Sequence, residues 1–228
     1  MTQRLNAKGR PFSWSYSSLT DFEGCPARYA AKRFYCTTVE PPTEFTLWGE
    51  RVHKAFEERI RDGKPFPEDF PTTYEPWARV LEKLPGEKFF EQKLAVDEKW
   101  ELCEFFAPGA CGRGVVDLLV VNGTEAVIVD YKTGKQKTDE TQAKLFCWFV
   151  GHKHPAVETF KYRYVWLKNN TPTGGELRRG ELMGVETKMR VRVSSMISAW
   201  NAENFPCFPS GLCSWCPVEE CVHWRPRR

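Results

Sequence analysis

The sequence predicts an α/β protein in which helices flank a mixed central β-sheet. Three observations support this fold class. Segments with helical periodicity lie near both ends of the chain, whereas the middle region changes to runs of β-branched residues. Two of those runs meet at Asn122-Gly123, a dipeptide that marks a tight β-hairpin. The hairpin is followed by a helical segment and then by another strand, an order that is typical of a mixed sheet.

The N-terminal third is expected to be helical. Its first segment is interrupted at Gly24-Cys25-Pro26, because proline fits the first turn of a new helix better than a helix interior. Its second segment ends at Asp62-Gly63, where glycine can close a helix. A proline-rich loop precedes the third segment. The expected helices are 15–34, 43–61 and 77–84, with the loop at 65–76.

The middle and the C-terminal part of the chain complete the expected sheet. The hairpin strands lie between other strands, and the last strand is an edge strand. The expected strands are 88–97, 100–106, 114–121, 126–132, 158–168 and 175–183. Two further helices are expected at 139–150 and 184–203, before a tail that is rich in cysteine.

Composition indicates a globular protein. Hydrophobic residues make up 41% of the 228 residues, and no stretch approaches the roughly 20 apolar residues that a membrane span needs. The first residues contain no apolar signal region, so we expect a cytoplasmic protein without a membrane partner. In a reducing compartment, clustered cysteines are more often metal ligands or buried thiols than disulfides.

Charge alone does not identify a partner. The net charge of +3 neither favours nor excludes nucleic acid. Basic clusters at 178–192 and at 223–228 could follow phosphates, although a solvated face is the plainer interpretation.

Two carboxylates occupy positions where a core strand should not carry them. If Asn122-Gly123 is a two-residue turn, Asp117 faces Ile128, and strand alternation puts Asp117, Asp130 and Lys132 on one face. The two carboxylates are then diagonal neighbours, within about 7–8 Å, and one cation could lie between them. Two carboxylates and a lysine on one face are suited to metal-assisted hydrolysis. The alternative is a structural ion pair between Asp117 and Lys132.

Asp117 together with the run Val129-Asp130-Tyr131-Lys132-Thr133-Gly134 resembles the core of the PD-(D/E)XK nuclease superfamily. The resemblance extends from about 13 to 224 and is to the branch of RecB and AddB nuclease domains and CRISPR-associated exonucleases. It implies a restriction-endonuclease-like core that binds Mg²⁺ or Mn²⁺. It further implies that Asp117, Asp130 and the backbone carbonyl of Tyr131 are metal ligands, and that Lys132 is catalytic.

Two further motifs fit the same branch. Gly49-Glu50-Arg51-Val52-His53 matches its Gly-x-x-x-His motif, which implies that His53 is a metal ligand; from its spacing alone, a core histidine is the plainer interpretation. Gln142 resembles the start of the Gln-x-x-x-Tyr motif that lines the active site, but Phe146 occupies the tyrosine position and carries no hydroxyl group. Glu91 could also face the site, as an acidic residue does in some relatives, or could simply be solvated at a strand edge.

Three cysteines of the tail have the spacing of metal ligands. Cys213, Cys216 and Cys221 supply three thiolates, one short of a closed site. The resemblance adds Cys25 as the fourth ligand and implies a four-iron, four-sulfur cluster that joins the two ends of the chain. A local zinc site completed by Cys207 or His223 is the alternative, and a tail without metal is the third possibility.

The expected domain organisation follows from these motifs. Residues 1–228 form one domain, in which 43–183 are the nuclease core and 13–36 with 205–224 form the cluster cap. The resemblance implies an exonuclease that acts on DNA ends, prefers single strands and serves recombination, repair or phage DNA metabolism. No phosphate-binding loop for a motor is present, so a separate helicase or recombination protein is a conceivable partner. The alternatives are a DNA-binding protein without catalytic activity and a structure-selective endonuclease.

Overall fold

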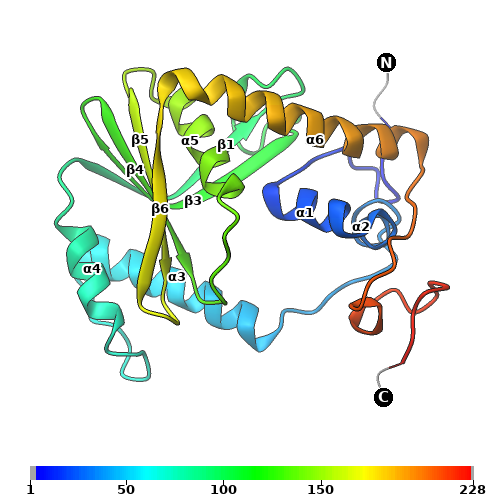
Figure 1. Ribbon diagram of the computed structural model, residues 1–228, viewed down its shortest axis with the longest axis horizontal. Helices are drawn as coiled ribbons and strands as arrows, with labels where there is room; N and C mark the ends of the chain where they lie inside the picture. The colour runs from blue at the N-terminus through cyan, green and yellow to red at the C-terminus, as the bar shows by residue number, and fades with distance from the viewer. Residues whose placement is uncertain (1–3, 227–228) are drawn as a thin grey trace. The chain divides into compact units, whose positions relative to one another are not determined.

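The structure is a computed structural model that describes residues 4–226 (Figure 1). The chain forms two compact units. Within the described residues, one unit comprises 4–41, 95–113 and 187–226, and the other comprises Pro42–Leu94 and Gly114–Glu186. Of the basic residues expected at the end of the tail, Arg227 and Arg228 lie outside the described residues.

The central sheet is mixed, as predicted, and has the strand order β2-β1-β3-β4-β5-β6 (Figure 1). Strands β4 and β5 run parallel, whereas the pairs β1–β2, β3–β4 and β5–β6 are antiparallel. Helix α5 (Thr141–Lys153) connects the two parallel strands. The strands are β1 (Glu87–Val96), β2 (Leu102–Cys103), β3 (Gly112–Asn122), β4 (Glu125–Lys132), β5 (Thr159–Trp166) and β6 (Thr171–Arg178).

Helix boundaries follow local signals in the sequence. Pro26 begins α2 immediately after α1 ends, and Gly63 closes α3 with a left-handed φ of 70°. The Thr43 hydroxyl group caps α3 by accepting a hydrogen bond from the backbone N–H of Thr46. The helices besides α5 are α1 (Tyr16–Gly24), α2 (Pro26–Arg33), α3 (Glu44–Asp62), α4 (Tyr74–Glu82) and α6 (Leu182–Ala202), with short 3₁₀ turns η1 (Arg179–Glu181) and η2 (Cys213–Trp215).

Most elements differ from their predicted bounds by one to three residues, and three differences have a local explanation or change an element most. Strand β2 is only two residues long, because Trp100 adopts a φ of 70° before it and a turn at Glu104–Ala107 follows it. Helix α4 begins three residues earlier than predicted, at Tyr74. Strand β6 ends at Arg178, because it pairs with β5 through a short hairpin in which Trp166 lies opposite Thr171.

The β3–β4 turn lies one residue later than predicted. Asn122 pairs with Glu125, so Gly123 and Thr124 form the turn, and Gly123 takes the left-handed φ of 57°. The predicted pairing of Asp117 with Ile128 is therefore wrong, since Leu119 lies opposite Ile128. The pairing shifts by two residues, and a shift of two preserves the alternation of faces. Asp117, Asp130 and Lys132 accordingly remain on one face of the sheet.

Helices pack on both faces of the sheet in the unit formed by 42–94 and 114–186. Helices α3 and α4 cover one face through a buried cluster that includes Phe56, Tyr74 and Val129. Helix α5 covers the other face, where the backbone N–H of Ala143 donates a hydrogen bond to the Tyr164 hydroxyl group at 3.0 Å. The catalytic candidates therefore lie on a sheet that is held rigidly from both sides.

The other unit has an aromatic core. The rings of Phe34 and Trp200 meet edge to face at 4.8 Å, and the Phe34 ring lies 5.1 Å from that of Phe205.

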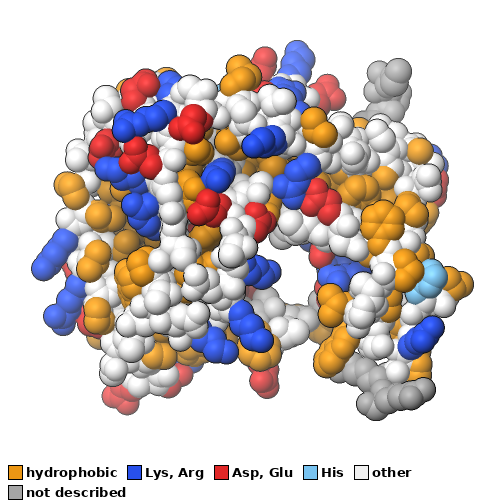
Figure 2. All heavy atoms as spheres, in the orientation of Figure 1, with side chains coloured by type: hydrophobic (Ala, Val, Ile, Leu, Met, Phe, Trp, Pro, Cys, Tyr) orange, Lys and Arg blue, Asp and Glu red, His pale blue; other side chains and the backbone are white. Residues whose placement is uncertain are grey.

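Basic and acidic side chains are interspersed on the face shown in Figure 2, as expected for a small net charge. Within 4–226, no helix is both long enough and apolar enough to span a membrane.

Candidate active site and cysteine cluster

The candidate active site lies at the end of the paired segment of β3 and β4, where the Asp117 side chain contacts the backbone of β4. The paired residues extend to Leu118 and Val129, and the buried Asp117 comes next. Its Oδ2 accepts a hydrogen bond of 2.8 Å from the backbone N–H of Tyr131. This contact holds the Asp117 carboxylate at the sheet and directs its second oxygen toward helix α3.

His53 approaches the two strands from helix α3. Its Nδ1 lies 3.3 Å from Asp117 Oδ1, and its Nε2 lies 2.9 Å from the carbonyl oxygen of Tyr131. The neighbouring Val52 and Phe56 are fully buried, so the helix face that packs on the sheet also fixes the imidazole. His53 thus contacts two groups that the sequence marks as metal ligands, although it stands more than 60 residues before them.

The surroundings of His53 favour its protonated form. Burial lowers the pKa of the imidazole, but the hydrogen bond and charge of Asp117, the charge of Asp130 and the Tyr131 carbonyl together raise it to about 9. A protonated ring can donate from both nitrogens, to Asp117 and to Tyr131. Without a bound cation, the protonated His53 ring therefore provides the positive charge next to Asp117 that a cation would otherwise provide.

Glu91 joins the same cluster from strand β1. One donor atom each of His53, Glu91 and Asp117 lies within 4.8 Å of the others. Glu91 has a φ of 46°, a left-handed conformation that costs a non-glycine residue roughly 1–2 kcal/mol. Burial, followed by the charge of Asp117, raises the pKa of the Glu91 carboxyl group. The only sequence signal for this residue is an acidic side chain next to two phenylalanines in a strand.

Asp130 and Lys132 lie together on the face that α5 covers. Lys132 Nζ is 2.7 Å from Asp130 Oδ2, and it donates a hydrogen bond of 3.1 Å to Gln142 Oε1 on α5. Burial and the charge of Asp117 raise the pKa of Asp130, which is 5% exposed. Although Lys132 is close, Asp130 Oδ2 accepts no hydrogen bond of good geometry. Gln142 therefore positions the lysine, and one buried carboxylate oxygen still lacks a well-placed partner.

This donor set fits a divalent cation. Three carboxylates and a backbone carbonyl are hard oxygen ligands of the kind that Mg²⁺ or Mn²⁺ prefers, and the imidazole adds one softer nitrogen ligand. Besides burial, the charge of Asp117 raises the pKa values of Glu91 and Asp130, and a cation among the three carboxylates would relieve that repulsion. The group of His53, Glu91 and Asp117, with one donor atom of each within 4.8 Å of the others, is the observation that speaks most directly for such an ion.

Phe146 has a packing role at the position of the motif tyrosine. It is buried one turn of α5 after Gln142. A side chain at Gly114 on β3 would approach the Phe146 ring within 2.8 Å, so the ring packs directly on the strand. The structure therefore places Gln142, but not Phe146, in contact with the predicted catalytic lysine.

A second cluster, which we call the cysteine cluster, lies in the other unit. Its members are Cys25, Cys207, Cys213, Cys216 and Cys221, which line one small cavity together with His223. Cys25 precedes α2, and the backbone N–H of Ala27 donates a hydrogen bond to the Pro206 carbonyl at 3.3 Å, which ties the helix to the tail. The structure thus brings Cys25 to the three tail cysteines and adds Cys207, for which spacing offered only the zinc alternative.

One sulfur–sulfur distance in the cysteine cluster can be compared with the spacing of thiolates around a zinc ion. Four thiolates around one zinc ion, each at about 2.3 Å, lie roughly 3.8 Å apart. The sulfurs of Cys207 and Cys221 are 3.7 Å apart, but among the described residues no three cysteine sulfurs lie within 4.8 Å of one another. The Cys207–Cys221 pair has the spacing of two thiolates on one zinc ion, whereas the five thiols together do not form a closed zinc site in this arrangement.

Comparisons with known proteins identify the family of this chain. The model of the PD-(D/E)XK nuclease superfamily matches residues 13–221. A solved structure from Eubacterium rectale, a protein to which exonuclease activity is ascribed, matches with a TM-score of 0.51 and 15% identity over 95% of this chain and 91% of that chain. The crystal structure of SSO0001 gives a TM-score of 0.46 and 10% identity over 93% and 87%. No curated protein matches this chain.

Proposed function

Because the chain belongs to the PD-(D/E)XK nuclease superfamily, we propose that it is a Mg²⁺- or Mn²⁺-dependent exonuclease that hydrolyses phosphodiester bonds at the ends of DNA, with a preference for single strands. The observation that carries this proposal is the convergence of Asp117, Asp130 and Lys132 with His53 and Glu91 where β3 and β4 separate.

Each residue of the site has a role that its position supports. Glu91, Asp117 and Asp130 would hold the cation together with the His53 imidazole and the Tyr131 carbonyl. When bound, the ion supplies charge neutralisation for the phosphate and lowers the pKa of a coordinated water molecule. Lys132 Nζ, held between Asp130 and Gln142, orients the attacking water molecule and contacts the phosphate from the side of α5.

Circular DNA tests the preference for ends. With Mn²⁺ or Mg²⁺ added, linear single-stranded DNA is expected to be degraded to short products, whereas a circular single strand of the same sequence stays intact. Cutting of the circle would favour the structure-selective endonuclease, and binding of both substrates without cleavage would favour a non-catalytic DNA-binding protein. A chelator provides the control, because the proposed chemistry needs the cation.

Metal binding is expected to release a proton from His53. With a pKa of about 9, the metal-free imidazole is protonated at neutral pH and must lose that proton to coordinate. Above about pH 7, where Asp130 is already ionised, the affinity for Mn²⁺ should therefore rise by up to about tenfold per pH unit until pH 9, and cleavage should weaken at acidic pH. Calorimetry in buffers of different ionisation enthalpy measures the number of protons released.

The matched variants are His53→Gln and His152→Gln. The first should release about one proton fewer than the wild-type protein and show a shallower dependence of affinity on pH. The second changes an exposed histidine of α5 outside the cluster and should behave like the wild type. Equal proton release by His53→Gln and the wild type would show that His53 is not a ligand.

For the cysteine cluster we propose a four-iron, four-sulfur cluster held by Cys25, Cys213, Cys216 and Cys221. The gathering of five thiols around one cavity, Cys25 among them, supports it. Its role would be structural: residues 13–36 and 205–224 would form a cap on the nuclease core at 43–183, within one domain of residues 1–228.

We propose that the exonuclease activity serves recombination, repair or phage DNA metabolism. A separate helicase or recombination protein would supply the DNA strands.

A further inference from the structure

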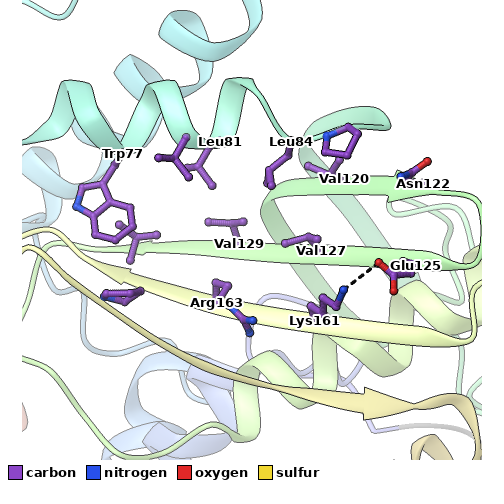
Figure 3. A pocket seen from close by; sticks show the side chains of 14 residues that line it. Trp77, Leu81, Leu84, Val120, Asn122, Glu125, Val127, Val129, Lys161 and Arg163 are labelled. Carbon is purple, nitrogen blue, oxygen red and sulfur yellow. Dashed lines mark hydrogen bonds and ion pairs between the residues drawn. The ribbon is translucent and has the colours of Figure 1, made fainter.

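An apolar groove, which we call the α4 groove, lies on the sheet face that carries α3 and α4 (Figure 3). Its volume is about 440 Å³. Trp77, Leu81 and Leu84 form one wall, and Val120, Val127 and Val129 form the floor, as Figure 3 shows. The side chains of Val129 and Asp130 alternate along β4, so the groove lies on the reverse side of the strand that carries the catalytic candidate.

The dimensions of the groove suit a short peptide. Pockets that bind ligands usually measure 300–1,000 Å³ and combine an apolar lining with a few polar groups. The part of the wall on α4, from Trp77 to Leu81, runs for about 6 Å along the helix, and Leu84 extends the wall beyond the helix end, so a few residues of an extended chain would fit. Val80, on the same wall, is 57% exposed, and the indole N–H of Trp77 is fixed by a 2.6 Å hydrogen bond to Asn170 Oδ1.

The charges at the groove are unequally compensated. Lys161 is paired with Glu125 at 2.9 Å, so these two charges offset each other (Figure 3). Arg163 is exposed, and one guanidinium nitrogen donates to the carbonyl oxygens of Tyr162 at 2.8 Å and Gly175 at 2.9 Å. These acceptors are neutral, and Arg163 forms no ion pair with a carboxylate in the part of the chain that the structure describes. Arg163 therefore gives the lining of the groove a positive charge that is held by neutral acceptors and not neutralised.

We propose that the α4 groove binds a short acidic segment of a partner protein. Two or three bulky apolar side chains of that segment occupy the floor, and a carboxylate pairs with Arg163. Apolar burial supplies the affinity, and the carboxylate sets the orientation of the segment. A nucleic-acid strand fits less well, because a phosphate backbone requires several cations and the lining offers only one uncompensated charge.

A peptide array tests this proposal. The purified full-length protein is applied to random-sequence hexapeptides, and the strongest binders are measured in solution by fluorescence anisotropy. We expect enrichment of sequences that combine a carboxylate with at least two large apolar residues. Absence of enrichment, or enrichment of basic peptides, would overturn the proposal.

Matched variants locate the binding. Val80→Asp should abolish binding, and Arg163→Ala should weaken it by about tenfold or more, consistent with the loss of one charged contact. Val191→Asp is the control, because Val191 is 64% exposed on α6 and lies outside the groove. All three variants should keep the melting temperature and DNA cleavage of the wild type. Undiminished peptide binding by Val80→Asp would refute the proposal. The proposal would also fail if the wild-type protein were a dimer that Val80→Asp dissociates, because the occupant of the groove would then be a second copy of the chain.

Discussion

Asp130→Asn is expected to lower DNA cleavage by roughly a thousandfold or more and to leave the metal-free protein at least as stable as the wild type. The loss of activity follows because an amide cannot replace a carboxylate as a ligand to a divalent cation. Stability should be kept because Asp130 is buried close to Asp117 and one of its oxygens has no well-placed hydrogen-bond donor.

The sign of the stability change follows from the raised pKa of Asp130. The pKa of this carboxyl group is higher in the folded state than its ordinary value of 3.8. Its contribution to stability is therefore fully present below pH 3.8 and is lost as the pH rises through the folded-state pKa of about 7. At pH 8 the ionised Asp130 therefore lowers the free energy of unfolding, and asparagine removes that cost. Thermal melts from pH 4 to pH 8 should show the gain of the variant growing with pH.

Lys132→Ala extends this test to the other side of the site. It should lower cleavage by a similar factor without unfolding the protein, because it removes the group that orients water and phosphate. Lys135→Ala is the matched control, since Lys135 is exposed just beyond β4 and should keep full activity. If Asp130→Asn or Lys132→Ala cleaved DNA at the wild-type rate, the chemistry would have to lie elsewhere in the molecule.

The second large effect is expected from Cys25→Ser, which should lose iron and melt at a lower temperature than the wild type. A cross-link between Cys25 and the tail closes a loop of nearly 190 residues. Removing a closure of that length costs up to about 5 kcal/mol by the chain-entropy relation for cross-links, which corresponds to a fall of roughly 10–20 °C in melting temperature. Activity should fall only in proportion to the unfolded fraction.

Metal content identifies the group that the cysteines bind. Anaerobically purified wild-type protein should be brown and contain iron and labile sulfide in similar amounts, and Cys25→Ser should contain less of both. Cys103→Ser is the control, because Cys103 lies in β2 and not at the cysteine cluster. A colourless protein that holds stoichiometric zinc, keeps it in Cys25→Ser and loses it in Cys207→Ser would establish the local zinc site.

Much of the fold could be predicted because the relevant signals are local. Pro26 and Gly63 mark helix ends through their own backbone preferences, and the runs on either side of Asn122 are β-branched. The alternation of side chains along a strand put Asp117 and Asp130 on one face even though the turn was placed one residue early. Patterns of this kind depend on steric preferences within a few residues, which remain the same in any tertiary context.

Only the tertiary structure decided which distant groups meet. The approach of His53 to Asp117 and to the Tyr131 carbonyl depends on how α3 packs over the sheet, and the inclusion of Glu91 depends on a left-handed turn of the backbone within β1. Cys207 joins the other thiols because the tail folds back against α2. Such contacts depend on packing between segments that are far apart in the sequence. The number of residues between two groups does not predict these contacts, because only the packed core brings the groups within a few ångströms of each other.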